Sequence, residues 1–183
     1  MSPLESKRLA VLSKFSLESN DLGKTAMMKF LYLLQEVYGV SLKYDFEIYT
    51  YGPYSAEVMG DIDFAWHNEI ISVETCHYPT GVGYLLRPTE QAKETVKSER
   101  TFIEKNKGSI DSIITNFGSK TAKELELITT IIYIYKQYLK NNWNISNNEI
   151  SNNVREIKPH FSLEEVKKEY QNLENLKVFS LAS

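Results

Sequence analysis

The sequence predicts an α+β protein that is mostly helical, with a winged helix-turn-helix-like N-terminal domain and a helical subdomain after it. Three observations support this fold class. Several apolar-periodic runs follow a serine or threonine with a glutamate three residues later, which is typical of helix starts. An alternating, aromatic run precedes a Gly-Pro pair, and a hairpin pattern lies between two helical patterns. We place the winged-helix-like domain at 1–107 and the helical subdomain at 108–183.

The first two helices are predicted at 3–17 and 24–38. Ser2 caps the first helix, Pro3 suits its first position, and Glu5 completes a capping box. The second helix carries one apolar stripe with a 3.6-residue period, formed by Met27, Phe30, Leu31, Leu34, Val37 and Tyr38.

A strand is predicted at 44–51, because its side chains alternate between two faces. Gly52 and Pro53 are expected to end this strand, and Pro53 suits the first turn of a third helix at 53–67. The inward side chains expected on that helix are Val58, Ile62, Ala65 and Trp66.

A two-stranded wing is predicted next, with strands at 70–76 and 84–87 around a turn at 79–83. A fourth helix is expected at 90–107. The order helix, helix, strand, helix, hairpin, helix matches a winged helix with a two-stranded wing. The segment 84–90 also resembles the junction between wing and helix in many bacterial winged-helix regulators.

The C-terminal part is predicted to be helical at 109–117, 122–141, 147–157 and 163–177. Capping boxes begin at Thr121, Ser146 and Ser162. The run 131–135 makes the longest of these helices apolar over more than one face, which suggests burial on two sides. A homodimer through the C-terminal helices is therefore expected.

Composition places limits on the class of protein. The chain has 183 residues, a formal net charge of −3 and one cysteine, so an internal disulfide framework is excluded. It lacks a secretory signal pattern and any run of about 18 apolar residues, so we expect a cytoplasmic protein that does not cross a membrane. A protein that coats nucleic acid would usually be basic.

The motifs that resemble catalytic sites are incomplete. The tripeptide at 23–25 imitates the end of a phosphate-binding loop, but Glu18 stands where that motif needs glycine. His67 and Glu69 match half of a zinc deaminase motif, whose other half needs two cysteines. Cys76 and His77 are neighbours on a predicted strand and therefore point to opposite faces. We expect no cofactor, no metal centre and no catalysis; an enzyme using Cys76 or a metal is the least favoured alternative.

Two features favour a protein partner. Tyr44, Tyr49, Tyr51 and Tyr54 form an aromatic cluster, which either offers a contact platform for a protein or for stacked bases, or packs the strand against helices. The third helix is acidic. The predicted partner-binding residues are these four tyrosines with Glu57 and Asp61.

A winged-helix DNA-binding regulator is the alternative function. The helix before the wing usually reads DNA, yet here it carries Glu57, Asp61 and Asp63 and has no lysine or arginine, so phosphates would repel it. Under this alternative, the nucleic-acid contacts would come from Lys24, Lys29 and Lys43, which are otherwise expected on a solvated helix edge.

Five segments carry a family resemblance: the helix from Lys24-Thr25 to Gln35-Glu36, the strand Tyr44-Asp45-Phe46, the run Tyr51-Gly52-Pro53-Tyr54-Ser55, and the segments 121–126 and 157–162. Together they resemble the YwgA family of small bacterial proteins, over about residues 20 to 177. More distantly, the unit of helix, strand and Tyr-Gly-Pro resembles the Panacea-type domain of SocA-like antitoxins. The first resemblance implies a small, non-enzymatic bacterial protein, and the second implies antitoxin activity.

Overall fold

A computed structural model describes residues 2–19, 22–78 and 81–182. Within these ranges the protein is mostly helical and contains two small antiparallel sheets of two strands each, which confirms the mostly helical α+β class. The first eight elements are α1 (Pro3–Glu18), α2 (Lys24–Glu36), β1 (Glu47–Tyr49), β2 (Gly52–Tyr54), α3 (Ala56–His67), β3 (Ile71–Tyr78), β4 (Gly81–Pro88) and α4 (Glu90–Ser98). The rest are α5 (Arg100–Lys105), α6 (Lys107–Phe117), α7 (Ala122–Lys140), α8 (Asn147–Ile157), α9 (Leu163–Asn175) and α10 (Val178–Ala182).

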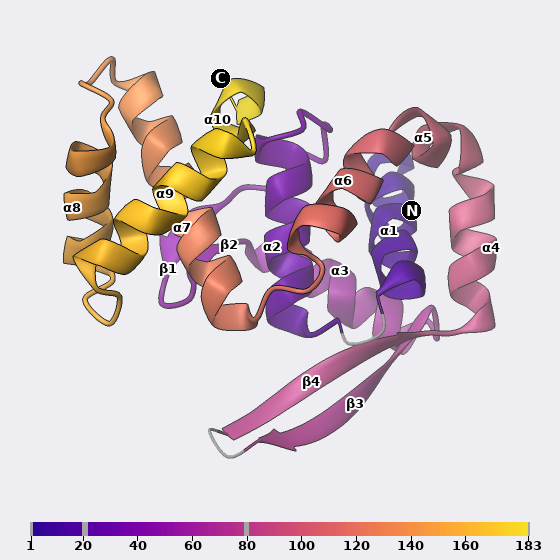
Figure 1. Ribbon diagram of the computed structural model, residues 1–183. Helices are drawn as coiled ribbons and strands as arrows, with labels where there is room; N and C mark the ends of the chain where they lie inside the picture. Colours follow the sequence, from indigo (N-terminus) through magenta and orange to yellow (C-terminus); the bar gives the residue numbers. More distant parts are fainter. Residues whose placement is uncertain (1, 20–21, 79–80, 183) are drawn as a thin grey trace.

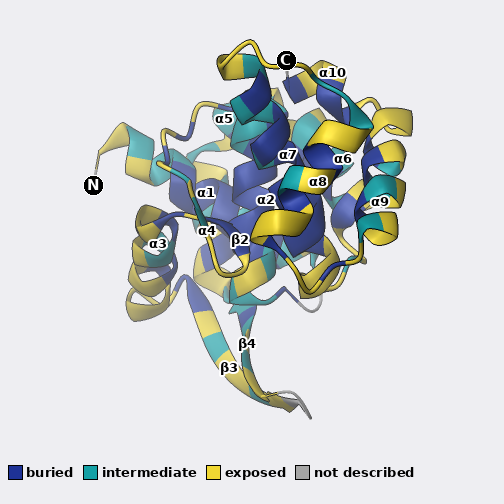
Figure 2. Ribbon diagram, turned by 90° about the vertical axis from the view of Figure 1, so that its left-hand side faces the viewer, coloured by how far each residue is buried: buried dark blue, intermediate teal, exposed yellow. Residues whose placement is uncertain are grey.

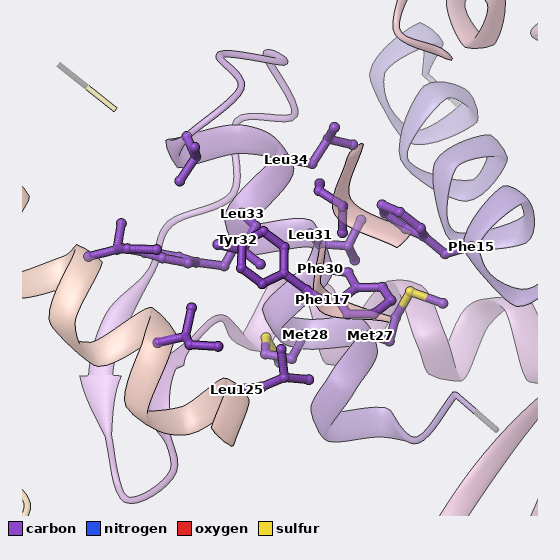
Figure 3. Close-up of a cluster of buried hydrophobic side chains, with 14 of the residues drawn as sticks. Phe15, Met27, Met28, Phe30, Leu31, Tyr32, Leu33, Leu34, Phe117 and Leu125 are labelled. Atoms are coloured by element: carbon purple, nitrogen blue, oxygen red, sulfur yellow. The ribbon is translucent and has the colours of Figure 1, made fainter. Parts of the chain in front are cut away.

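Helix α2 occupies the centre of the molecule and contacts α1, α3, α6 and α7 (Figure 1). Its apolar stripe is buried as predicted except for Tyr38, which is half-buried, and Figure 3 shows Phe30, Leu31 and Leu34 clustered with Phe15 and Phe117. The rings of Phe15 and Phe30 meet edge to face with centroids 5.3 Å apart. One buried cluster joins residues from both sides of residue 107, and the division into two domains at that point stays a prediction.

The predicted caps hold the helix starts. Ser2, Thr121 and Ser162 each accept a hydrogen bond from the N–H of the glutamate three residues on, and each of those glutamates accepts from the cap N–H. Ser146 accepts from the N–H of Glu149 at the start of α8. These caps explain why the starts of α1, α7, α8 and α9 were predicted within one residue.

The predicted end of the first strand is wrong. Gly52 and Pro53 do not end a strand or open a helix; they form strand β2, which pairs with β1 around a turn at Thr50 and Tyr51. Gly52 has a φ of +84°, which favours glycine, and a Cβ there would lie 3.1 Å from Thr130 Oγ1 of α7. Pro53 pairs with Ile48 at a position where the ladder needs no N–H donor. Helix α3 therefore begins only at Ala56.

The hairpin that was predicted as a wing is longer than expected. Strands β3 and β4 pair from Ile71–Pro88 to Tyr78–Gly81 and project from the helical body (Figure 1). Part of the predicted turn, residues 79–80, lies outside the described residues, while the rest of it belongs to strand β4. A bridge between Gly23 and Leu85 attaches the start of α2 to the wing, and the Leu86 N–H donates to Leu22 O at 2.9 Å.

The predicted helix at 90–107 is divided into α4, α5 and the start of α6. Glu99 and Asn106 have non-helical backbone angles at the two breaks. The Asn106 side chain donates to Phe102 O at 2.8 Å, and the Asn106 N–H is shared between Phe102 O and Ile103 O at 3.2 Å each, a bifurcated arrangement that is common at helix ends.

Helix α7 is covered on several sides by α2, β2, α8, α9 and α10 (Figure 2 shows it in the buried colour). The apolar residues at 131–135 are therefore buried or half-buried within one chain. This packing removes the reason for expecting self-association through this helix, because its apolar faces already have partners. Among the described residues, no helix combines the length and the apolarity that a membrane span needs.

Candidate interaction groove

Three tyrosines lie on the surface of the hairpin formed by residues 47–54, hereafter the tyrosine hairpin. Tyr49 and Tyr51 are each 67% exposed, and Tyr54 is 38% exposed. The rings of Tyr49 and Tyr54 lie with centroids 5.7 Å apart. The hairpin thus presents large aromatic side chains to solvent instead of packing all of them against helices.

A groove of about 1010 Å³ runs beside this hairpin. The tyrosine hairpin forms one side of it, and the start of α7 and the segment 157–160 form another. The groove combines aromatic and aliphatic side chains with charged ones, and its lining consists of Thr25, Ile48, Tyr49, Thr50, Tyr51, Val82, Ala122, Lys123, Glu126, Ile157, Lys158 and His160.

Two oppositely charged side chains are buried at the base of the groove. Glu126 of α7 and Lys158 are only 5% and 4% exposed, and Lys158 Nζ lies 3.1 Å from Glu126 Oε1. Lys158 also donates to the backbone oxygens of Tyr49, at 2.8 Å, and Thr50. This lysine therefore fixes the turn of the tyrosine hairpin to helix α7.

A second buried lysine holds the other strand of the hairpin. Lys29 of α2 is 2% exposed and donates to Pro53 O at 2.6 Å. Burial lowers the pKa of Lys29 to about 7; nearby Glu126 acts in the opposite direction, and Lys158 adds to the lowering. We call Lys29, Glu126 and Lys158 the buried anchor.

The buried anchor contains one carboxylate for two lysines, and His160 shares it. His160 Nε2 lies 3.2 Å from Glu126 Oε1, although neither His160 nor Lys158 approaches that oxygen in hydrogen-bond geometry among the described residues. With Lys123 at the rim, the charged lining has three basic side chains against one acidic side chain. Because Lys158 is buried and paired with Glu126, the exposed charged groups of the lining are Lys123 and His160, which are both basic.

The predicted partner-binding set is divided between two places. Tyr44 is 5% exposed and donates through its hydroxyl to Asp61 Oδ2 at 2.7 Å, so its prediction as a surface contact is wrong. The Arg8 guanidinium lies 4.1 Å from the Tyr44 ring and 3.4 Å from Glu57 Oε1. Burial raises the pKa of both Tyr44 and Asp61. Tyr44 and Asp61 therefore belong to a network around Arg8, while Glu57 is exposed and contacts Arg8 from the outside.

Arg8 also secures the segment that leads into the tyrosine hairpin. Its guanidinium donates to Leu42 O at 2.7 Å and to Lys43 O at 2.6 Å. The chain between α2 and β1 is therefore tied to α1, and the hairpin beyond it starts from a fixed position.

The three lysines of the nucleic-acid alternative have different environments. Lys29 is buried in the anchor, so its prediction as an exposed cation is wrong. Lys24 lies 3.4 Å from Asp63 and 5.4 Å from the centroid of the Tyr84 ring. Lys43 is exposed and has a φ of +55°.

The other chemical candidates are scattered over the surface. Cys76 is a half-buried free thiol on β3. His67 Nδ1 lies 2.7 Å from Asp63 O of its own helix. Within the described part of the chain, no group of three histidine, cysteine or acidic side chains is placed to hold a metal ion.

The buried anchor is the part of the site that sequence reasoning missed. Lys29 stands inside the apolar run of α2, and Glu126 stands between Leu125 and Leu127, so each interrupts an apolar pattern. A charged residue inside an apolar pattern is the sequence signal for a buried charge. Such a charge needs a partner in the core, because an unpaired buried charge is costly. The sequence does not show that the two partners meet. No protein-family model matches the sequence, and no curated protein matches it.

Proposed function

We propose that this chain is a non-enzymatic bacterial regulatory protein that acts by binding a protein partner through the groove beside the tyrosine hairpin, as an antitoxin binds its toxin. One observation carries the proposal: Tyr49 and Tyr51 are exposed on a hairpin that two buried lysines attach to the core.

Exposed tyrosines on a fixed support are well suited to protein recognition. Tyrosine supplies a large contact area with few rotatable bonds, and it is common among the residues that dominate binding energy. A hairpin that is already fixed loses little conformational entropy on binding, which improves affinity. The buried anchor gives the tyrosine hairpin this rigidity.

The groove also indicates the chemistry of the partner. Its exposed basic side chains are Lys123 and His160, since Lys158 is buried and paired with Glu126, and its apolar surface includes Ile48 and Ile157. A partner segment with acidic and apolar side chains would be complementary in charge and in polarity. We therefore expect the partner to present aspartate or glutamate beside an apolar residue.

The proposal is tested by comparing variants as bait in a lysate of the source organism. The double variant Tyr49→Ala/Tyr51→Ala is expected to recover the partner at least about tenfold less than the wild type, because hot-spot tyrosines typically contribute more than 1 kcal/mol each. Trp143→Ala removes an aromatic side chain outside the groove that is 56% exposed, against 67% for each tyrosine, and is the matched control. Quantitative mass spectrometry of the captured proteins gives the ratio.

Two results would contradict the proposal. One is a set of captured proteins that is the same for the wild type and the double variant. The other is the absence of any protein enriched over a bait-free control. Thermal unfolding of the double variant shows whether the hairpin substitutions leave the fold intact, as their exposure predicts.

A winged-helix DNA-binding regulator is the second candidate. The element order favours it, as does the bridge that joins Gly23 to Leu85 beside the wing. The charge of α3 opposes it, because this helix has Glu57, Asp61 and Asp63 and no lysine or arginine. This candidate predicts binding to random duplex DNA that weakens steeply between about 50 and 200 mM salt, whereas the protein-partner proposal predicts no such binding.

A further inference from the structure

Helix α3 exposes two aromatic side chains at its C-terminal end. Phe64 is 45% exposed and Trp66 is 47% exposed, while Ala65 between them is fully buried. Trp66 was expected to point inward, and this expectation is wrong. Figure 2 shows much of the outer side of α3 in the exposed colour. Because residues two positions apart on a helix do not face each other, the two rings point to different sides of α3.

Each aromatic side chain borders its own hollow. Phe64 lines a hollow of about 510 Å³ between α1, α3 and α4, and Trp66 lines one of about 500 Å³ between the end of α3, the base of the wing and the start of α4. Asn68 and Gln91 line both hollows, so the two adjoin. Together they form one surface, hereafter the α3–α4 face, which shares no lining residue with the groove beside the tyrosine hairpin.

The lining of the α3–α4 face contains acidic side chains, two of which pair with lysines of α4. Glu69, Glu90 and Glu94 line the two hollows, and no described lining residue is lysine, arginine or histidine. Lys93 lies 2.7 Å from Glu90 and Lys97 lies 3.6 Å from Glu94, both as exposed pairs within α4. Exposed pairs of this kind are weak, so an incoming cation competes with them easily.

We propose that the α3–α4 face binds a protein segment that carries arginine or lysine together with an apolar side chain. The apolar side chain enters the hollow beside Phe64, where buried Leu9 and Ile70 add apolar surface. The cation meets Glu90 or Glu94, and an arginine also stacks on the exposed ring of Trp66. The charged side chains that line this face are acidic, whereas the exposed charged side chains that line the groove are basic, so the protein has two surfaces for two kinds of segment.

The probe is a fluorescein-labelled peptide of alternating arginine and leucine, titrated against the purified protein by fluorescence anisotropy. Two peptides serve as comparisons, one with glutamate for arginine and one with serine for leucine. We expect the arginine–leucine peptide to bind at least about tenfold tighter than either, because the face combines apolar and acidic contacts. Phe64→Ala/Trp66→Ala and, separately, Glu90→Gln/Glu94→Gln are each expected to weaken that binding about tenfold.

Matched controls separate this inference from the proposed function. Tyr49→Ala/Tyr51→Ala alters only the other surface and should leave the affinity unchanged, as should Glu104→Gln/Glu156→Gln, which removes two exposed carboxylates elsewhere. If the aromatic variant unfolds, the conservative glutamine variant carries the test. Failure of the wild type to bind the arginine–leucine peptide, equal binding of the glutamate peptide, or equal affinity of all variants would overturn the inference.

Discussion

Glu126→Gln is expected to lower the free energy of unfolding by about 3 kcal/mol at about pH 6, because it leaves two buried lysines without their carboxylate. The substitution keeps the shape of the side chain, so the loss reports charge and not a cavity. Lys158, which is 4% exposed, would keep its hydrogen bonds to the hairpin carbonyls but lose its only counter-ion within the described residues. Urea unfolding followed by circular dichroism gives the free energy.

The pH dependence of this loss identifies its cause. At about pH 9 Lys29 has lost its proton, since burial lowers its pKa to about 7. In the variant at that pH, only Lys158 of the two lysines is then a buried positive charge without a carboxylate. The loss caused by Glu126→Gln should then be smaller than at about pH 6. Glu156→Gln removes an exposed carboxylate on α8 and should change stability by no more than about 0.5 kcal/mol at either pH. If Glu126→Gln lowered the free energy of unfolding by no more than Glu156→Gln does, the role of Glu126 in the buried anchor would be contradicted.

Lys29→Met is expected to remove a rise in stability that the wild type shows as pH increases from about 7 to about 10. The folded pKa of Lys29 is about 7, while an unfolded lysine has a pKa near 10.4. Between these values the unfolded chain binds the extra proton, so the free energy of unfolding increases with pH. Below pH 7 the folded protein bears the full cost of keeping a buried Lys29 charged. This cost is about 4 kcal/mol, from the difference of about three pKa units.

The measurement is the difference in unfolding free energy between Lys29→Met and the wild type at several pH values. At about pH 6 the variant should be more stable by about 2–3 kcal/mol, since it avoids the penalty but loses the hydrogen bond to Pro53 O, worth about 1 kcal/mol. At about pH 10 this advantage should disappear. Lys168→Met, at an exposed position of α9, is the matched control. A difference that does not change with pH would mean that Lys29 keeps an ordinary pKa.

The helices were the most predictable part of this fold. Helices α1 and α8 were predicted to within one residue, because Ser2 and Ser146 mark their starts and an apolar period follows. Local chemistry decides such elements, since a cap and the face of a helix both lie within a few residues of sequence. The single helix predicted at 90–107 is broken at Glu99 and Asn106, whose backbone angles are not helical, and hydrophobic periodicity does not reveal such breaks.

The tyrosine hairpin was predictable only in part. The sequence predicts Tyr49 and Tyr51 as contact residues, but it also predicts that Gly52 and Pro53 end the strand, because proline is rare inside strands. Their role in β2 depends on helix α7 and on Lys29, which are distant in sequence. The buried anchor escaped prediction for the same reason, since pairing between distant charges is a property of the folded chain.

The central claim, that a protein partner binds beside the tyrosine hairpin, is tested most directly by photo-cross-linking in living cells of the source organism. The photoreactive residue p-benzoylphenylalanine replaces Tyr51 in one strain and Trp143 in another, since both positions are exposed aromatic sites. We predict a discrete cross-linked product of higher mass at position 51 that is absent at position 143. The claim would be contradicted if no product formed at position 51, or if the same products formed at both positions.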